Sequence, residues 1–300
     1  MKMNVAWLYA ITKYGYPPPI NKIFNIIDDM KNLGFDAIEL EVYTAKNLLE
    51  FGEKKKEIKK KIKDLDLKVI NLAAVLPELL DANEEIRKKG IEYFKRSINL
   101  ANFFESPMIQ TDTFTPPLKF EGRGPYKGAI VFGEKYKVIV DQTFSWKKFW
   151  KMLVTTMKKC AKAAKKGDLL FTVEPRVGET ISNSDAMLKL LEEVNEENFG
   201  AVLDCGHLNA AKELIPLSIE KLGEKIMYVH ASDNDGRDNY HFAPGKGTID
   251  WDGVFQALKK HKFNGYVAID VGGEEVKNRL DEEVLEAKKF LEELSKKHGF

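Results

Sequence analysis

Strand-like and helix-like stretches alternate eight times along this 300-residue chain, and this alternation restricts the fold more than any other feature. Each short run of β-branched and apolar residues is followed by a longer stretch with apolar residues every three or four positions, as on the buried face of a helix. Parallel strands need such helical crossovers, so eight units predict a closed (β/α)8 barrel. The strands are expected at residues 5–9, 37–42, 67–72, 108–111, 171–174, 201–204, 226–230 and 266–270.

The competing fold is an open, doubly wound sheet, but no Gly-x-Gly-x-x-Gly follows the first strand. No linker rich in Gly, Ser or Pro divides the chain, so residues 1–300 are predicted to form one domain. The regular pattern breaks at residues 114–145, where segments 129–132 and 136–140 flank Gly133 and predict a β-hairpin. A long insertion at such a position can be a lid, a subunit contact in a homo-oligomer, or a surface decoration.

The last four predicted strands each end on a residue type that binds metals. These residues are Glu174, Asp204, His230 and Asp270, and they recur at intervals of about 25 to 40 residues, roughly one strand plus one helix. A single acid at a strand end is more often a helix cap or an ion-pair partner. In a barrel, however, the carboxyl ends of all strands meet at one face. Four such endings in phase therefore predict one divalent metal ion, Mn²⁺, Mg²⁺, Co²⁺ or Zn²⁺, held by oxygens and one imidazole.

Three of the five histidines, His207, His230 and His241, lie close together in the sequence after the sixth strand. His207 follows Asp204 by three residues, and it can hold a substrate hydroxyl, cap its own helix or bind a second metal. The polar segment 232–238 directly after His230 must owe part of its composition to turn formation. His261 and His298 lie in helical patterns and are expected to be structural or exposed.

The balance of charge argues against two classes of partner. The chain has 47 basic and 46 acidic residues, so its net charge of +1 provides no long-range attraction to nucleic acid or to anionic membranes. The lysine-rich segment 54–63 contains Ile58 and Ile62 at helical spacing and is interpreted as the solvated face of a helix. Two cysteines without a Cys-x-x-Cys pair, no signal peptide and no 18-residue apolar run predict a cytoplasmic protein. Abundant Lys and Glu with few Gln are typical of thermophile composition.

The strand endings and their neighbours resemble the xylose isomerase-like TIM-barrel superfamily, which includes sugar 3-epimerases, hydroxypyruvate isomerase, inosose dehydratase and endonuclease IV. The resemblance covers essentially the whole barrel. It is carried by Val173-Glu-Pro, Leu203-Asp-Cys-Gly-His207, Val229-His-Ala-Ser-Asp233, His241-Phe-Ala-Pro-Gly-Lys-Gly247 with Ile249-Asp-Trp251, and Gly265-Tyr-Val-Ala-Ile-Asp270.

In the ketose 3-epimerases, Glu, Asp, His and Glu at these strand ends hold a metal, and the two glutamates exchange a proton with the sugar. The resemblance implies that Glu174 and Asp270 are catalytic, although Asp270 is one methylene shorter than the family's glutamate. His207 matches the family's substrate-binding histidine. Glu179, Arg237 and His241 are further candidates for binding substrate, and Arg176 stands where xylose isomerases have a catalytic lysine. Trp7 and Phe114 are candidates for an apolar floor under the sugar.

The resemblance therefore implies a metal-dependent isomerase or epimerase acting on a small sugar or polyol. Glu274 and Glu275 begin the last helix where a phosphate would bind, so an unphosphorylated substrate is favoured. One alternative is a lyase of the inosose-dehydratase kind, and another is a non-catalytic barrel that binds a sugar or metal. The trinuclear site of endonuclease IV is not expected, since no histidine precedes His207.

Overall fold

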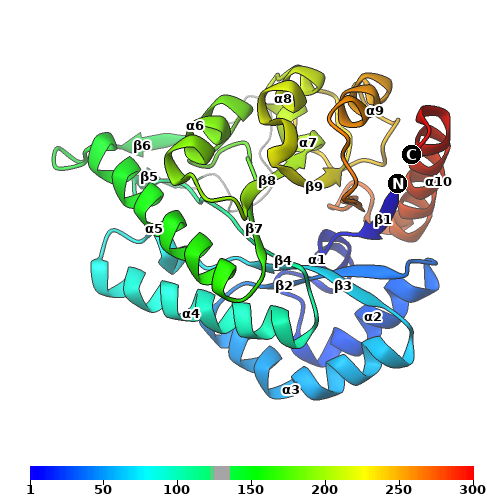
Figure 1. Ribbon diagram of the computed structural model, residues 1–300, viewed down its shortest axis with the longest axis horizontal. Coiled ribbons are helices and arrows are strands. Elements are labelled where there is room, and N and C mark those ends of the chain that lie inside the picture. The colour runs from blue at the N-terminus through cyan, green and yellow to red at the C-terminus, as the bar shows by residue number, and fades with distance from the viewer. Residues whose placement is uncertain (123, 125–135) are drawn as a thin grey trace.

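The computed structural model describes residues 1–122, 124 and 136–300, and its central element is a closed barrel of eight parallel strands surrounded by helices (Figure 1). The strands pair in the order β1-β10-β9-β8-β7-β4-β3-β2, so the first strand closes the barrel against the last. This confirms the predicted fold class. The barrel strands are β1 (Lys2–Val5), β2 (Ala37–Val42), β3 (Lys68–Ala74), β4 (Met108–Thr111), β7 (Leu170–Val173), β8 (Phe199–Asp204), β9 (Ile226–Ala231) and β10 (Tyr266–Ile269).

The helices pack around the outside of this barrel through their apolar faces. Strand residues that point outward, such as Ile38, Leu40 and Val42 of β2, join the helices in one large buried cluster. The longer helices are α2 (Ile23–Asn32), α3 (Ala45–Asp64), α4 (Glu84–Phe103), α5 (Trp146–Lys166), α6 (Ser184–Val194), α9 (Trp251–Lys260) and α10 (Leu280–His298), with shorter ones at α1 (Leu8–Tyr14), α7 (Cys205–Ala210) and α8 (Ile215–Leu222).

A second, smaller apolar cluster, centred on strand residues, lies apart from the first and includes Ala37, Met108, Val202, Tyr228 and Ala268. Because strand side chains alternate between two faces, the residue two positions further along each strand points to the same side, one layer closer to the carboxyl end. In each of these five cases that residue is polar. The layer above the apolar cluster therefore contains Glu39, Gln110, Asp204, His230 and Asp270.

The first predicted strand, at residues 5–9, is wrong in its position. The strand is Lys2–Val5, and the chain then turns into helix α1, whose N-cap is Trp7. The run from Trp7 to Ile11 is apolar throughout, and a short apolar run fits a buried strand and a buried helix equally well. Pairing of Lys2 to Val5 with Tyr266 to Ile269 of β10 fixes the strand earlier in the chain.

The insertion after β4 contains an antiparallel hairpin of β5 (Lys119–Glu121) and β6 (Lys137–Ile139). The predicted strand at 136–140 matches β6, whereas the segment 129–132 lies outside the described residues. The partner strand is instead Lys119–Glu121, which was not predicted. The hairpin forms its own two-stranded sheet and does not extend the barrel.

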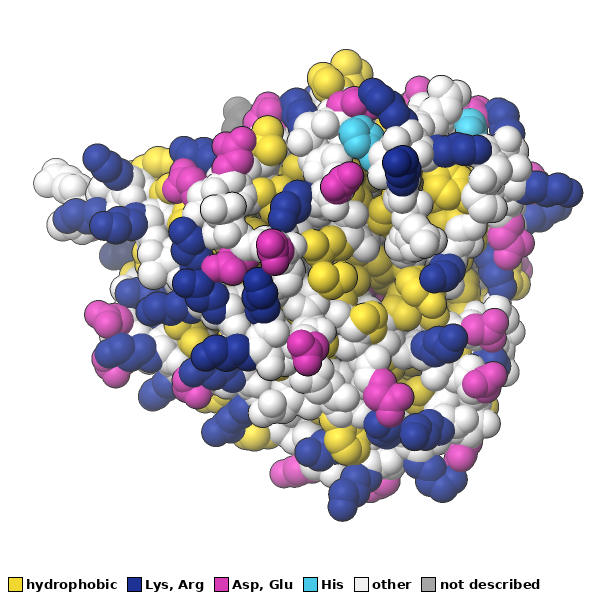
Figure 2. Space-filling model, viewed as in Figure 1, with side chains coloured by type: hydrophobic (Ala, Val, Ile, Leu, Met, Phe, Trp, Pro, Cys, Tyr) yellow, Lys and Arg dark blue, Asp and Glu magenta, His cyan; other side chains and the backbone are white. Residues whose placement is uncertain are grey.

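Ile58 and Ile62 on α3 are buried while lysines dominate its solvent face, as expected for a surface helix. Both cysteines are free and buried. Acidic and basic side chains are interspersed over the face seen in Figure 2, in keeping with the balanced composition. Among the described helices, none combines the length and the apolar character that a membrane crossing requires.

Candidate active site and metal centre

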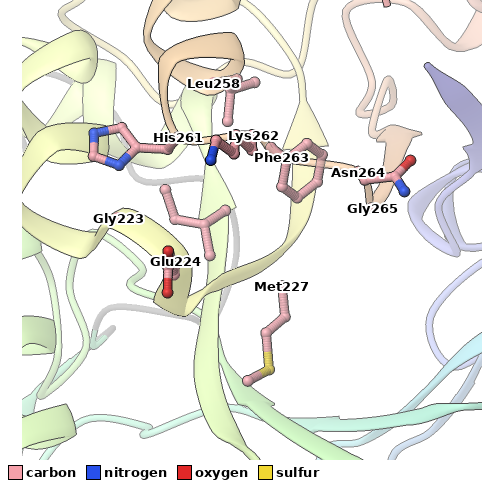
Figure 3. A pocket seen from close by; sticks show the side chains of 10 residues that line it. Gly223, Glu224, Met227, Leu258, His261, Lys262, Phe263, Asn264 and Gly265 are labelled. Carbon is pink, nitrogen blue, oxygen red and sulfur yellow. The ribbon is translucent and has the colours of Figure 1, made fainter.

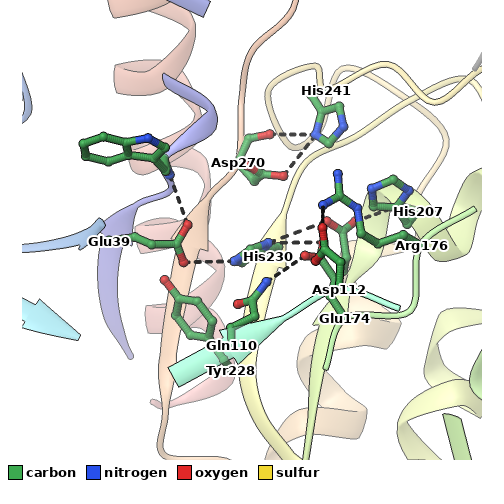
Figure 4. Close-up of polar contacts among 12 residues, drawn as sticks. Glu39, Gln110, Asp112, Glu174, Arg176, His207, Tyr228, His230, His241 and Asp270 are labelled. Atoms are coloured by element: carbon green, nitrogen blue, oxygen red, sulfur yellow. Dashed lines mark hydrogen bonds and ion pairs between the residues drawn. The ribbon is translucent and has the colours of Figure 1, made fainter. Parts of the chain in front are cut away.

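The residues predicted at the strand ends gather at the carboxyl end of the barrel (Figure 4). Glu174 directly follows β7, Asp204 is the last residue of β8, His230 lies near the end of β9, and Asp270 directly follows β10. All four side chains are buried. Two triads could each hold a metal ion, with ligand atoms within 4.8 Å of one another: Glu174, Asp204 and His207, and Asp204, His230 and Asp270.

Asp204 belongs to both triads, and its two carboxylate oxygens have different surroundings. Its Oδ1 accepts a hydrogen bond from the backbone N–H of His207 at 2.7 Å and caps α7. Its Oδ2 is buried and has no hydrogen-bond partner in the described chain. A side chain at position 206 would collide with Oγ of Ser232, just after β9, so glycine lets α7 lie close to this strand end. A buried carboxylate oxygen without a donor is costly, and a cation at this position would satisfy it.

The electrostatics of the site also favour binding of a cation. Burial and the neighbouring Glu174 carboxylate raise the pKa of Asp204 well above its usual range. Burial also opposes ionisation of Glu174, but His230 and Arg176 together lower the pKa of Glu174 well below its ordinary value. The Nδ1 atom of His230 lies 3.4 Å from Oε1 of Glu174 and 3.8 Å from Oδ2 of Asp204. The donor set, three acids and one imidazole, therefore fits a divalent cation.

Asp270 is held by His241, which reaches it from the loop between β9 and α9. Nδ1 of His241 lies 3.1 Å from both Oδ2 and the backbone oxygen of Asp270, so this nitrogen carries the hydrogen. Burial alone would raise the pKa of Asp270, but His241 lowers it overall. His241 thus keeps the Asp270 carboxylate ionised and fixes its orientation.

The loop that carries His241 is fastened by Asp233, which is fully buried. The backbone of Asp233 exchanges two hydrogen bonds with Phe242, and its carboxylate accepts from the N–H of Gly245 and from Nε1 of Trp251, at 2.9 and 2.8 Å. Further along, Oδ1 of Asp235 accepts two backbone N–H groups in a turn. The polar segment 232–238 therefore serves turn and loop structure, as the sequence suggested in part.

His207 is positioned as a hydrogen-bond donor. The backbone N–H of Val177 donates to its Nδ1 at 3.3 Å, so in the neutral ring the hydrogen is on Nε2. Burial and Arg176 lower the pKa of His207 well below its ordinary value, which keeps the ring neutral. Nε2 is buried and has no partner in the described chain. A protonated Nε2 cannot ligate a metal, so this geometry favours contact with a substrate oxygen over a second metal site.

Arg176 and Glu179 lie on the loop after β7 and contact the loop after β4. Nη1 of Arg176 donates to Oδ2 of Asp112 at 2.8 Å. Oε2 of Glu179 accepts from the N–H and the hydroxyl of Thr113 and from the N–H of Phe114, at 2.9 to 3.0 Å. Burial and Asp112 nevertheless raise the pKa of Glu179 to about 8. Its Oε1 is buried without a partner in the described chain.

The remaining candidates differ in their exposure. Trp7 is buried, its backbone N–H donates to Oε1 of Glu39 at 3.2 Å, and its Nε1 has no acceptor among the described residues. Phe114 is partly buried against the core. Arg237 is exposed on the loop after β9, whereas the other candidate residues are buried or half-buried.

Three buried polar residues beside the site were not identified as functional from the sequence: Glu39 on β2, Asn71 on β3 and Gln110 on β4. Gln110 donates through Nε2 to Oε2 of Glu174 at 2.9 Å. The available signal was their position, since each directly follows two apolar residues within its strand. A polar residue inside such a run is informative because buried polar groups need partners.

A separate surface pocket of about 280 Å³ lies at the opposite, amino-terminal end of β9 and β10 (Figure 3). It is lined by residues that include Glu224, His261 and Lys262. His261 is already engaged there, with Nε2 at 3.2 Å from Glu220. The amino-terminal face of such barrels contributes to stability rather than catalysis. The carboxyl-end cluster is therefore the candidate site.

Solved structures of similar fold cover nearly the whole chain. D-psicose 3-epimerase from Clostridium cellulolyticum H10 matches with a TM-score of 0.74 at 18% identity, over 98% of this chain and 99% of that one. L-ribulose 3-epimerase matches with a TM-score of 0.74 at 16% identity, over 99% and 96%. The IOLI protein, solved with a bound zinc atom, matches with a TM-score of 0.71 at 18% identity, over 99% of both.

Curated relatives match over shorter stretches. An uncharacterised protein of Methanocaldococcus jannaschii is 28% identical over 112 residues, which is 36% of each chain. Inosose dehydratase of Clostridium beijerinckii is 21% identical over 168 residues, 50% of this chain and 55% of that one. Inosose isomerase of Bacillus subtilis is 28% identical over 116 residues, 37% and 42%. These matches therefore span between about a third and just over half of the relatives' length.

The model of the family described as xylose isomerase-like TIM barrel matches residues 27–294, which is most of the chain and includes seven of the eight barrel strands. The expected resemblance is thereby confirmed, and this protein belongs to the xylose isomerase-like TIM barrel family.

Proposed function

We propose that this protein is a metal-dependent isomerase or epimerase of a small, unphosphorylated sugar or polyol. The observation that carries the proposal is the meeting of Glu174, Asp204, His230 and Asp270 at the carboxyl end of the barrel, with Oδ2 of Asp204 buried and unpartnered. The neighbouring folds include psicose and ribulose 3-epimerases, and relatives include an inosose isomerase, which agrees with this class of reaction.

In this proposal, Glu174, Asp204, His230 and Asp270 hold the cation. When bound, it supplies Lewis-acid stabilisation of negative charge on a carbonyl oxygen and an adjacent hydroxyl. Glu174 is ionised at neutral pH and removes the neighbouring C–H proton. The Oε2 atom of Glu174 accepts a hydrogen bond from Gln110, so the other oxygen, Oε1, is the one that faces the site beside His230. Asp270, fixed by His241, lies across the substrate and exchanges the proton on the other face.

Substrate binding is assigned to groups with unused hydrogen-bonding capacity. His207 offers Nε2–H to a substrate oxygen. Glu179, whose pKa is about 8 and whose Oε2 already accepts three hydrogen bonds, carries its proton on Oε1 at neutral pH and donates it to a substrate hydroxyl oxygen. Arg176 remains charged at all accessible pH values and stabilises a developing oxyanion. Trp7 and Phe114 form an apolar floor under the sugar. Arg237 and His241 complete the set from the loop after β9, and Arg237 would have to reach inward from its exposed position.

An unphosphorylated substrate is supported by the backbone before the last helix. The last helix begins at Leu280, so Glu274 and Glu275 lie in a turn before it and not in its first turn as predicted. The backbone N–H groups that a phosphate could bind at this position belong to Gly272 and Gly273. Both donors are engaged, since Gly272 donates to the oxygen of His241 at 3.1 Å and Gly273 donates to Oγ1 of Thr12 at 2.9 Å. The site also contains several buried carboxylates, which repel an additional anion.

The proposal is tested by bound-metal analysis followed by a substrate panel. Protein purified without chelator is expected to contain about one equivalent of a divalent metal, or to take up Mn²⁺, Co²⁺ or Zn²⁺ tightly. The metal-loaded protein is then assayed with ketoses, aldoses and inosose by product chromatography. Absence of metal uptake contradicts the proposal. Metal uptake without turnover of any sugar supports a non-catalytic binding barrel instead.

A lyase of the inosose-dehydratase kind is the second candidate, favoured by the matches to several inosose dehydratases. The same base and metal ligands serve both reactions, because each begins with removal of a proton beside a carbonyl. They differ in whether a hydroxyl leaves as water. The mass of the inosose product distinguishes them, since isomerisation leaves the mass unchanged and dehydration lowers it.

His207 gives a prediction that separates substrate contact from metal binding. Replacing His207 with Phe removes the Nε2–H donor while keeping a planar ring, and kcat/KM is expected to fall about tenfold, the value of one hydrogen bond of about 1.4 kcal/mol. Metal content should remain that of the native protein. Loss of one metal equivalent in the variant would show instead that His207 is a ligand.

A further inference from the structure

Buried hydrogen bonds among residues of β2, β3 and β4 reach one proposed ligand, Glu174, and include a carboxylate, Glu39, that lies beside another, His230. Asn71 donates through the single atom Nδ2 to Oε2 of Glu39 and to Oε1 of Gln110, both at 2.7 Å. Gln110 in turn donates to Oε2 of Glu174 at 2.9 Å. The same Oε2 of Glu39 lies 3.4 Å from Nε2 of His230 (Figure 4).

The orientation of the two side-chain amides, Asn71 and Gln110, follows from Glu39. A carboxylate can only accept hydrogen bonds, so the atom of Asn71 that faces it must be the amide nitrogen. That nitrogen has a second hydrogen, and it requires an acceptor from Gln110, namely the oxygen Oε1. Gln110 is therefore turned so that its nitrogen, and not its oxygen, faces Glu174.

The same carboxylate determines which nitrogen of His230 faces the site. Nε2 of His230 is buried, and Glu39 is its nearest charged partner in the described chain. An Nε2–H directed at Glu39 leaves Nδ1 for the opposite side, where Glu174 and Asp204 lie at 3.4 and 3.8 Å. Carboxylates that orient a metal-binding histidine in this way strengthen metal binding.

We infer that Asn71 is a positioning residue that orients two metal ligands at once, Glu174 through Gln110 and His230 through Glu39. This inference rests on the proposed function, because it assumes that the site holds a metal. Asn71 lies on β3, on the side of the barrel that contributes none of the four proposed ligands. Its two N–H groups bind Gln110 and Glu39, and these two side chains contact the ligands that follow β7 and lie on β9.

The main test replaces Asn71 with Asp, which keeps the shape but removes both N–H groups and places a carboxylate against Glu39. The dissociation constant for Co²⁺, measured by competition with a chelator, is expected to rise about 10- to 100-fold. The visible absorption of the bound Co²⁺, which reports its coordination, should also change. Asn71→Leu, which introduces no charge, is expected to weaken binding in the same direction.

Asn198 provides a matched control. It also donates twice through Nδ2, to the backbone oxygens of Ala161 and Leu169 at 3.0 and 3.1 Å, but it lies at the amino-terminal end of β8, away from the site. Asn198→Asp should lower the melting temperature while leaving the Co²⁺ dissociation constant within about threefold of native, the range of changes that touch no ligand partner.

A double substitution tests the route of the effect. If Asn71 acts through Gln110, then adding Gln110→Leu to Asn71→Leu should weaken Co²⁺ binding by less than Gln110→Leu does alone. Native affinity and native absorption in Asn71→Asp, or in Asn71→Leu if the Asp variant does not fold, would overturn the inference while leaving the proposed function intact. Failure of the native protein to bind Co²⁺, Mn²⁺ or Zn²⁺ would instead remove the proposed function itself.

Discussion

Replacing Glu174 with Gln is expected to lower kcat about 100- to 10,000-fold on every sugar that the native protein converts, which is the usual contribution of a general base. Glutamine keeps the size of the side chain and can still accept the hydrogen bond from Nε2 of Gln110, so the local packing is retained. What is lost is the ionised carboxylate that takes the proton. The measurement is steady-state kinetics with saturating metal, together with exchange of substrate hydrogen for solvent deuterium.

Glu213 supplies the control for this substitution. Its carboxylate accepts from the backbone N–H of Ser184 and from Oγ of Ser218, so Glu213→Gln perturbs a hydrogen-bonded acid outside the proposed site. It should leave kcat within about twofold, as expected for a change distant from the reacting atoms. Unaltered turnover and deuterium exchange in Glu174→Gln would show that Glu174 is not the base.

Replacing Asp204 with Asn is expected to change stability in opposite directions with and without metal. When folding raises the pKa of an acid, its protonated form contributes fully to stability below the unfolded pKa of about 3.9. This contribution is lost as the pH rises from there through the folded pKa. Burial and Glu174 raise the pKa of Asp204 in this way. At neutral pH in the presence of chelator, Asp204→Asn should therefore melt at a higher temperature than the native protein.

With metal present, the order should reverse. A ligand at 100 times its dissociation constant stabilises the folded state by about 2.7 kcal/mol, and the variant loses much of this because it lacks one charged ligand. Asparagine is as good an N-cap as aspartate, so α7 keeps its cap. The control is Asp250→Asn at the N-cap of α9, where Oδ1 accepts from Gly253 at 2.9 Å. Melting curves that shift equally with and without metal would contradict the assignment of Asp204.

Much of the fold could be predicted because its signals are local. The β2 and β4 strands lie where the apolar runs placed them, and Gly34 after α2 has a positive φ of 77°, as expected for a glycine that ends a helix. The errors arose where local signals were ambiguous. The apolar run from Trp7 to Ile11 fits both strand and helix, and the short strand Lys119–Glu121 is too brief for its alternation to be distinctive.

The sequence by itself determined which chemical groups lie at the carboxyl ends of the last four strands. This follows because a strand has a fixed period of two and a barrel gathers all its strand ends at one face. The sequence alone therefore predicts that four side chains meet at this face: Glu174, Asp204, His230 and Asp270. The tertiary structure decided how three of them are held: His241 contacts Asp270, Gln110 contacts Glu174, and Glu39 lies beside His230, with Asn71 bound to both Gln110 and Glu39. Those contacts join strands far apart in the chain, and no local spacing encodes them, because they depend on how the strands are staggered in the closed barrel.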